Sequence, residues 1–204
     1  SLTVYGNGAG YVELEVDSGV NLDSSLTLAV HNPTGNADYG ALRLKANWQG
    51  PGGLVKEEAG LAAFTGAGKT YTGPTVVNQG VLQFTQPASP AQSVSVTVNP
   101  GGQLRLTSAS TAGEPKVYDF GGDLSLNSLG RGGALPDVTG LGVSGALRYE
   151  PDTDDSTAVI TNRIVFSGPS VIHLENARNT LELSGPLLGA HGFSKTGSGN
   201  LVLP

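Results

Sequence analysis

The sequence has no cysteine and no methionine, and tryptophan occurs once among its 204 residues. Without cysteine the chain cannot form disulfides, thiolate nucleophiles or cysteine-based metal sites, and it is compatible with passage through an oxidising periplasm. Without methionine the chain as given has no initiator residue. We therefore expect it to follow the cleavage of a signal peptide or to begin inside a longer polypeptide.

Charge is also sparse, since only 14% of the residues are charged and the formal net charge is −6. The 11 basic residues are scattered singly. The sequence therefore lacks the clustered lysines and arginines that track nucleic-acid phosphates or form a basic amphipathic helix. No apolar run approaches the roughly 20 residues that a membrane-spanning helix needs. These absences predict no nucleic-acid partner and no membrane insertion by this segment.

Glycine and proline are abundant, with 31 and 12 residues, and 38% of the chain is hydrophobic. Short stretches alternate between apolar and polar residues, as β-strands with one solvent-facing side do. Glycine- and proline-rich turns, such as residues 50–53 and 99–102, separate these stretches. The strands predicted in this way lie at residues 12–16, 26–28, 42–44, 94–98, 104–106, 124–126 and 181–183. Together these features predict an all-β fold.

An internal repeat narrows the choice of all-β architecture. The sequence around residues 42–60 returns near the carboxyl end at a constant offset of 139 residues, which pairs Gly53 with Gly192 and Lys56 with Lys195. Long-period repeats of short strands and glycines are typical of stacked, quasi-one-dimensional β folds. We predict one β-solenoid domain over residues 1–204, with roughly 8 to 10 coils of about 20 to 25 residues each. In this prediction residues 1–64 are equivalent to residues 140–203.

The first copy of the repeat, residues 53–84, also resembles a known module. Its order of G-G-L-x-K, a glycine-rich link, a short apolar strand, T-Y-T-G-x-T, V-V-N and G-x-L-Q is similar to the autotransporter passenger-associated strand repeat. Residues 57–59, Glu-Glu-Ala, depart from the usual Thr-Gly-x, and the second copy stops at Pro204 in mid-motif. The motif positions are Gly53, Lys56, Thr70, Tyr71, Thr72, Gly73, Thr75, Val76, Asn78, Gly80, Leu82 and Gln83, with Gly192, Lys195 and Gly199 in the second copy.

This resemblance implies a right-handed parallel β-helix that belongs to an exported bacterial protein of the extracellular space or cell surface. The function it implies is structural and adhesive, namely a rigid stalk that displays loops such as residues 130–139. The expected partners are neighbouring β-helix coils of the same or another chain, and a surface glycan or a host protein. We expect no catalysis and no cofactor.

Two alternatives stay open. Both ends of the sequence look like open coils, so one alternative is a self-stacking subunit of an extracellular filament. Parallel β-helices also include polysaccharide lyases and hydrolases, so the other is a polysaccharide-degrading or polysaccharide-binding β-helix. In that case Glu13, Glu15 and Asp17, which alternate along one predicted strand, would line a groove. A solvent-facing strand side explains the same row more simply.

The densest acidic cluster is a predicted turn with Asp152, Asp154 and Asp155. Carboxylates that alternate along a loop can wrap calcium, which takes six to eight oxygen ligands. The spacing lacks the glycine and the distal glutamate of an EF-hand loop, which favours a solvated turn. These three residues are the candidate calcium ligands, and the sequence predicts no other metal site.

Aromatic and imidazole side chains give two further expectations. Among the aromatic residues, Trp48 is the one most expected to be exposed and to stack on a sugar, because it precedes the turn sequence Gln-Gly-Pro. The tyrosines would instead stack inside the solenoid or cover its ends. His31, His173 and His191 lie far apart without a metal-binding spacing, and we expect them in turns or on the surface.

Overall fold

The computed structural model describes residues 1–5, 11–14, 19–31, 41–65, 68–85, 92–108, 114–130 and 145–204. All the regular elements in these ranges are β-strands. The same ranges contain no helix with the length and apolarity needed to span a bilayer. Part of the loop expected at residues 130–139 lies outside the described residues, from residue 131 onward, and so do Glu15 and Asp17.

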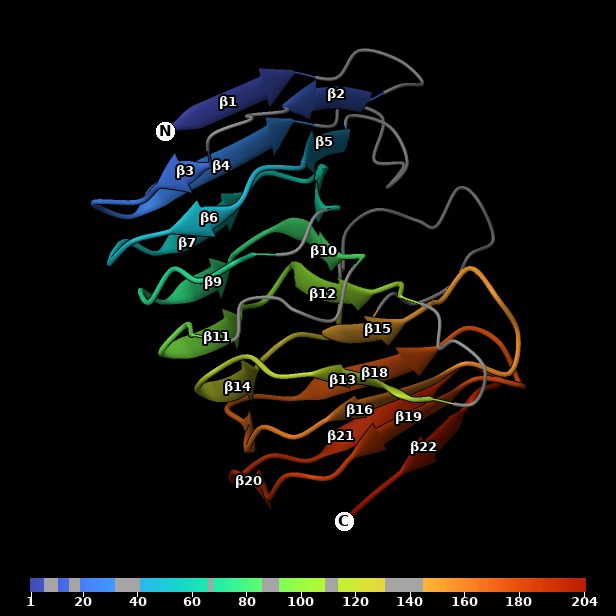
Figure 1. Ribbon diagram of the computed structural model, residues 1–204. Helices are drawn as coiled ribbons and strands as arrows, with labels where there is room; N and C mark the ends of the chain where they lie inside the picture. Colours follow the sequence, from blue (N-terminus) through green and yellow to red (C-terminus); the bar gives the residue numbers. More distant parts are fainter. Residues whose placement is uncertain are drawn as a thin grey trace.

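The strands form three faces of one stack, which we call face 1, face 2 and face 3 (Figure 1). Face 1 contains β1 (Leu2–Tyr5), β4 (Leu26–His31), β7 (Leu54–Glu57), β9 (Thr75–Val77), β11 (Ser95–Val98), β14 (Asp123–Leu126), β17 (Ile164–Phe166) and β20 (Leu187–Leu188). Face 2 contains β2 (Tyr11–Leu14), β5 (Ala41–Leu44), β8 (Leu61–Phe64), β10 (Gly80–Phe84), β12 (Gly102–Leu106), β15 (Leu147–Tyr149), β18 (Ser170–Leu174) and β21 (Phe193–Thr196). Face 3 contains a two-stranded sheet of β3 (Val20–Asn21) and β6 (Trp48–Gln49), and a four-stranded sheet of β13 (Lys116–Tyr118), β16 (Thr157–Ile160), β19 (Thr180–Leu183) and β22 (Asn200–Val202).

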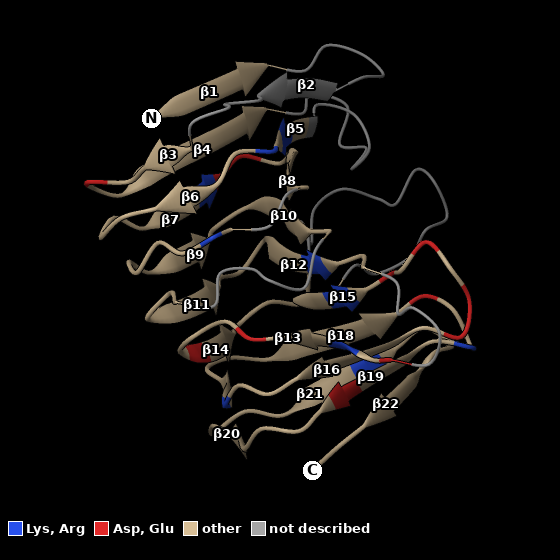
Figure 2. Cartoon of the chain, viewed as in Figure 1, with Lys and Arg blue, Asp and Glu red and all other residues tan. Residues whose placement is uncertain are grey.

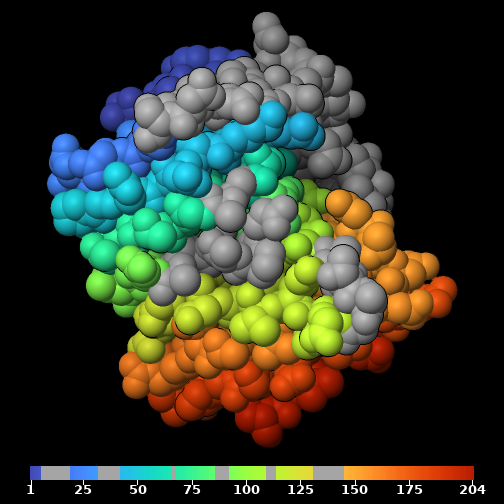
Figure 3. Space-filling view, in the orientation of Figure 1, coloured from blue at the N-terminus to red at the C-terminus, as the bar shows by residue number. Residues whose placement is uncertain are grey.

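Every strand pairing in the described residues is parallel. Each circuit of the chain adds a strand to face 1 and then to face 2, so that sequence order follows the axis of the stack (Figure 3). This arrangement is a parallel β-helix, and the predicted fold is confirmed. Each predicted alternating stretch falls on a strand in the described residues, except that the stretch 94–98 begins one residue before β11.

The coils differ in length more than the sequence predicts. Leu54 pairs with Thr75 and Thr75 with Val96, so two successive coils take 21 residues each. Leu124, by contrast, pairs with Ile164, which is 40 residues further along the chain. The extra residues leave the pairing of the faces intact because they extend the connections between strands.

Alternation along each strand sends every second side chain into the interior of the coil. On face 1, Leu28, Val77 and Val98 are fully buried, whereas their strand neighbours Thr27 and Val76 are half-buried. Burial of one such aliphatic side chain contributes about 1.5–3 kcal/mol. Aromatic rings in the interior also contact each other between successive coils. Phe64, for example, stacks on Phe84 with ring centroids 5.5 Å apart. The repetition of these contacts along the axis makes one continuous core.

Glycines mark the corner that leads into face 1, where the backbones of successive coils approach most closely. Gly52, Gly73, Gly122 and Gly185 each lie two residues before a residue that pairs on this face. A Cβ atom on Gly73 would lie 2.4 Å from the carbonyl carbon of Gly52 in the preceding coil. A Cβ atom on Gly122 would lie 1.9 Å from the carbonyl oxygen of Val94. The corner therefore requires residues without a side chain at these positions.

The two copies of the sequence repeat lie on different faces. Lys56 is on β7 of face 1, whereas Lys195 is on β21 of face 2. Both lysines occupy inward-facing positions, because Lys56 pairs with the buried Leu28 and Lys195 with the buried Ile172. The equivalence of residues 1–64 and 140–203 stays a prediction about the sequence. In the fold, the lysine of the second copy lies on face 2, the next face along the chain after face 1.

Candidate functional site

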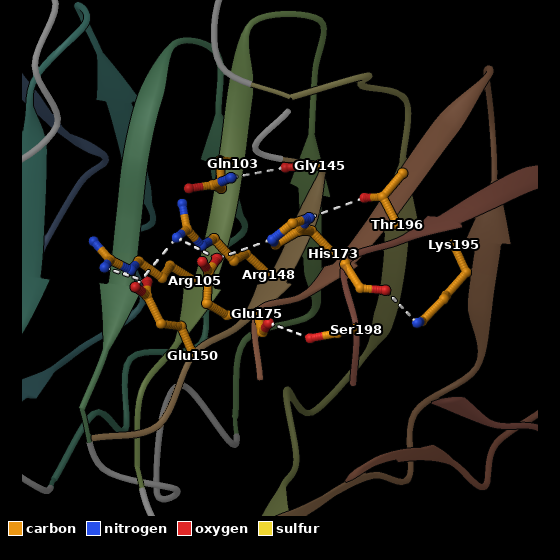
Figure 4. Close-up of polar contacts among 11 residues, drawn as sticks. Gln103, Arg105, Gly145, Arg148, Glu150, His173, Glu175, Lys195, Thr196 and Ser198 are labelled. Carbon is orange, nitrogen blue, oxygen red and sulfur yellow. Dashed lines mark hydrogen bonds and ion pairs between the residues drawn. The ribbon is translucent and has the colours of Figure 1, made fainter. Parts of the chain in front are cut away.

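A row of polar side chains follows the outer side of face 2. Arg105 in β12 pairs in register with Arg148 in β15, Arg148 with His173 in β18, and His173 with Thr196 in β21. Arg105, Arg148 and His173 point outward because the residues on either side of them along each strand fill the core, and Thr196 continues their row in register. Figure 4 shows them together with Glu150 and Glu175, and Figure 2 shows the basic segments of β12 and β15 on neighbouring strands. We call these six residues the face-2 ladder.

Two glutamates join the arginines of the ladder across successive coils. Glu150 forms ion pairs with Arg105 and with Arg148, the latter at 3.2 Å. Arg148 Nη2 also donates to Glu175 Oε2 at 2.8 Å. The Arg148 side chain is only 8% exposed, whereas that of Glu175 is 36% exposed. Partial burial strengthens these ion pairs beyond the 0–1 kcal/mol or so of a fully exposed pair, and desolvation offsets part of that gain.

His173 connects the ladder to the next coil. Its Nε2 lies 2.9 Å from Glu175 Oε2, and its Nδ1 lies 2.9 Å from the hydroxyl oxygen of Thr196. A hydroxyl, an imidazole and a carboxylate in this order have the connectivity of a nucleophile, a base and an orienting acid. Here the carboxylate is shared with Arg148, and the hydroxyl belongs to a β-branched residue at the end of a regular strand. These two features favour a structural link between coils.

The repeat lysine Lys56 lies near the start of the motif, on β7, and is fully buried. Its Nζ donates to the backbone carbonyl oxygens of Glu57 and Glu58, each at 2.6 Å, and of Gln79 at 3.1 Å. Burial lowers the pKa of Lys56 to about 7, and the nearby Glu57 and Glu58 oppose this shift. Two of the three acceptors lie at the end of β7 and directly after it, and the third belongs to the next coil.

Other motif residues of the first copy also make contacts between coils. Asn78 donates to the carboxylate of Glu57 at 2.7 Å and accepts from the side-chain amide of Asn99 at the same distance. The hydroxyl of Tyr71 lies 2.7 Å from Thr75 Oγ1, in the buried interior. Four further positions act through the backbone: Thr70 N–H donates to Trp48 O at 2.7 Å, Gly53 and Gly73 pack against neighbouring coils, and Gly80 has a φ of 71°.

The second copy of the motif is more open. Lys195 is exposed, and its Nζ donates to the carbonyl oxygen of Gly197 at 2.6 Å, two residues further along the chain, as Lys56 donates to Glu58. A Cβ atom on Gly192 would have no neighbour within 4 Å, whereas one on Gly199 would lie 2.7 Å from Asn176 O.

Two carboxylates of the acidic turn form ion pairs with an arginine. Asp155 and Asp154 form ion pairs with Arg178, and Asp154 also accepts from Asn176. Asp152 is exposed in the same turn. In the part of the chain that the structure describes, no three histidine, cysteine, aspartate or glutamate residues gather as a metal site. A calcium site at Asp152, Asp154 and Asp155 stays a prediction.

Two expectations about single residues are wrong. Trp48 is 1% exposed and packs edge to face on Phe64 with ring centroids 5.4 Å apart, so it is unavailable for stacking on a sugar. His173 is 8% exposed within β18 and belongs to the face-2 ladder. The expectation that tyrosines fill the interior is correct for Tyr71, Tyr118 and Tyr149, all of which are fully buried.

The face-2 ladder was not predicted from the sequence. Its members come from four strands whose spacing along the chain differs from coil to coil. The available signal was a polar residue inside an apolar stretch, as in the run Val171-Ile172-His173-Leu174. Such a residue marks an outward-facing strand position but does not identify its neighbours.

Comparison with known proteins agrees with this architecture. Residues 54–84 match the family described as passenger-associated-transport-repeat. A stretch of 152 residues, 74% of the chain, is 29% identical to the adhesin BmaC autotransporter of Brucella suis biovar 1 (strain 1330). The chain spans about 3% of the length of that relative. No solved structure matches the chain. The chain therefore carries an autotransporter passenger repeat, which occupies β7 to β10 of the stack.

Proposed function

We propose that this chain, which carries an autotransporter passenger repeat, is a rigid segment of an exported surface protein that presents adhesive loops and performs no catalysis. The observation that carries the proposal is the place of the repeat within the stack. Its strands pair with coils on both sides, β7 with β4 and β10 with β12. A motif whose strands pair with the preceding coil and with the following coil acts as a stacking unit. A stalk is built from such units.

The adhesive part of the proposal is supported by the related Brucella protein, which is an adhesin by name. Adhesion would use the outer side of the coils and the connections between them, because the inward positions are filled by the core. A surface glycan or a host protein is the partner that we propose. The direct structural partners are neighbouring coils, which the repeat is built to contact.

The test is surface display in a laboratory bacterium. The chain is placed between a signal peptide and an autotransporter β-barrel, and we measure protease resistance at the cell surface and adherence to cultured host cells. We expect a protease-resistant product that increases adherence over the barrel alone. Failure of the wild-type chain to reach the surface would refute the passenger proposal. Display without any gain in adherence would leave a spacer and remove the adhesive role.

Matched glycine variants control for folding in this experiment. Gly192→Ala should behave as the wild type because nothing lies within 4 Å of the added methyl group. Gly73→Ala should lose protease resistance because the methyl group collides with the preceding coil. If both variants were equally resistant, the surface signal would not report a stacked β-helix.

The two alternatives predict different results with the purified chain. Light scattering across concentration would show growth into uniform fibres if coils of another chain stack on its ends. Incubation with acidic polysaccharides would release new chain ends if the chain were an enzyme. We expect a monomer and no turnover.

A further inference from the structure

Lys56 stands in a column of core residues that is otherwise apolar. Following the register of face 1, its neighbours on the two sides are Leu28 and Val77, and beyond Val77 the column continues with Val98. All four side chains are fully buried. An amine thus occupies a position where the neighbouring coils place an apolar side chain. Burial of a charged amine is unfavourable unless hydrogen bonds and nearby charges compensate for the lost water.

The compensation at Lys56 comes mainly from backbone carbonyl oxygens. Glu57 at the end of β7 and Glu58 directly after it, where φ is 64°, supply one each, and Gln79 supplies the third from the coil that follows. The amine therefore spans the junction between β7 and β9. A neutral amine has two N–H donors, so deprotonation gives up one of these three contacts and offsets part of the relief from charge burial. If this junction opens, Nζ loses its contact with Gln79 and gains access to water.

Few charged groups surround the amine. The carboxylate of Glu57 is bonded to Asn78, and the carboxylate of Glu58 lies 3.5 Å from Nδ1 of His31. The strands packed against β7 are β4, β9 and β10. His31 is the one titratable residue that they carry within their described bounds. The two glutamates stabilise the charged amine only in part, since the pKa of Lys56 remains far below its ordinary value.

We propose that Lys56 makes the junction between β7 and β9 a proton-sensitive opening point of the β-helix, which opens more readily when the amine is protonated than when it is neutral. The inference does not depend on adhesion or export. The sign follows from linkage: the open coil exposes an amine that binds a proton more tightly than the closed coil does. The closed coil therefore gains stability as pH rises from about 7 toward the ordinary lysine value.

Lys195 provides the internal comparison. It occupies the matching motif position and makes the same contact with the carbonyl two residues further on, but its side chain is exposed. Lys195 is therefore the matched control position for a substitution at Lys56.

Hydrogen exchange of the purified chain, followed by mass spectrometry at pH 6 and pH 9 and corrected for intrinsic exchange rates, tests the proposal. We expect the opening equilibrium of peptides covering β7 and β9 to fall by up to about a hundredfold from pH 6 to pH 9. Peptides covering β14 and β17 should change far less. Lys56→Met should remove the pH dependence and raise protection at pH 6, whereas Lys195→Met should keep the wild-type profile.

Two results would overturn the proposal. One is equal corrected protection of β7 and β9 at both pH values in the wild-type chain. The other is weaker protection at pH 6 in Lys56→Met, which would mean that the ammonium holds the junction closed. If Lys56→Met does not fold, the wild-type profile is combined with an NMR titration of the Lys56 side chain. An amine that stays protonated up to pH 10 then contradicts the inference.

Discussion

Replacement of Gly73 by alanine gives the sharpest test of how the coils stack. The added Cβ would lie 2.4 Å from the carbonyl carbon of Gly52, and 2.5 Å from Gly52 O and from Gly53 N. All three are backbone atoms of the preceding coil, so rotation of a side chain cannot relieve the collision. Gly73 has an ordinary negative φ, because it is absent from the positive-φ glycines of the described residues. The predicted effect is therefore steric and not conformational.

The magnitude follows from the overlap. Carbon atoms normally approach to about 3.5–4.0 Å, so the two coils would have to separate locally by about 1 Å. Such a separation would stretch the hydrogen bonds of this corner, where Gly73 N donates to Gly52 O at 3.2 Å and Leu54 N to Pro74 O at 2.8 Å. Overpacking of a well-packed interior costs about 1–3 kcal/mol. We expect a loss of about 3 kcal/mol, because the colliding atoms are backbone and cannot rotate away.

Urea unfolding followed by the fluorescence of Trp48 measures this loss. Trp48 is buried near the affected corner and should report the local coils as they open. With a urea dependence of about 1–3 kcal/mol per molar, the midpoint should fall by about 1 M or more. Gly192→Ala is the matched control and should be neutral or stabilising by about 0.4–1 kcal/mol. A Gly73→Ala midpoint equal to that of the wild type would refute the close approach of the two backbones.

Three further predictions concern charged side chains. Arg148→Met should lower the free energy of unfolding by about 1–3 kcal/mol, because the half-buried carboxylate of Glu175 loses the guanidinium that it pairs with. Urea unfolding followed by circular dichroism measures this loss. Arg178→Ala should leave the thermal midpoint unchanged at both low and high salt, since its ion pairs are exposed. Burial lowers the pKa of Lys69 to about 8, so stability should rise between pH 8 and pH 10 in a Lys56→Met background. Adding Lys69→Met should flatten that rise in thermal melts.

The strands and the solenoid class could be predicted because their signals are local. Alternation between apolar and polar residues needs only a few neighbours, and residues 94–98 or 124–126 show it without any knowledge of the rest of the chain. The internal repeat indicated that the strands stack into a solenoid, since the glycines and the lysine of residues 53–60 return in the second copy. Residues 54–84, which carry the motif, match the family and form β7 to β10.

The burial of Trp48 and the neighbours of His173 could not be predicted, because both depend on register. The strand that contains Trp48 has two residues, which is too short to reveal which side faces the core. His173 meets Arg148 and Thr196 because coils that differ in length bring these residues together. Lys56 was recognised as a motif residue, but lysine is so rarely buried that a sequence gives no reason to place it in the core.

The hydrogen bonds between successive coils run along the axis of the stack, and this direction decides how the molecule bears a load. Tension applied between the two ends of such a stack acts on the ladders lengthwise, so that coils peel away one after another instead of shearing together. Each coil that opens lengthens the tether by about 3.4 Å per residue, which is about 70 Å for a coil of 21 residues and about 135 Å for the coil of 40 residues. Under tension the segment would extend in steps of unequal size and dissipate energy at each step.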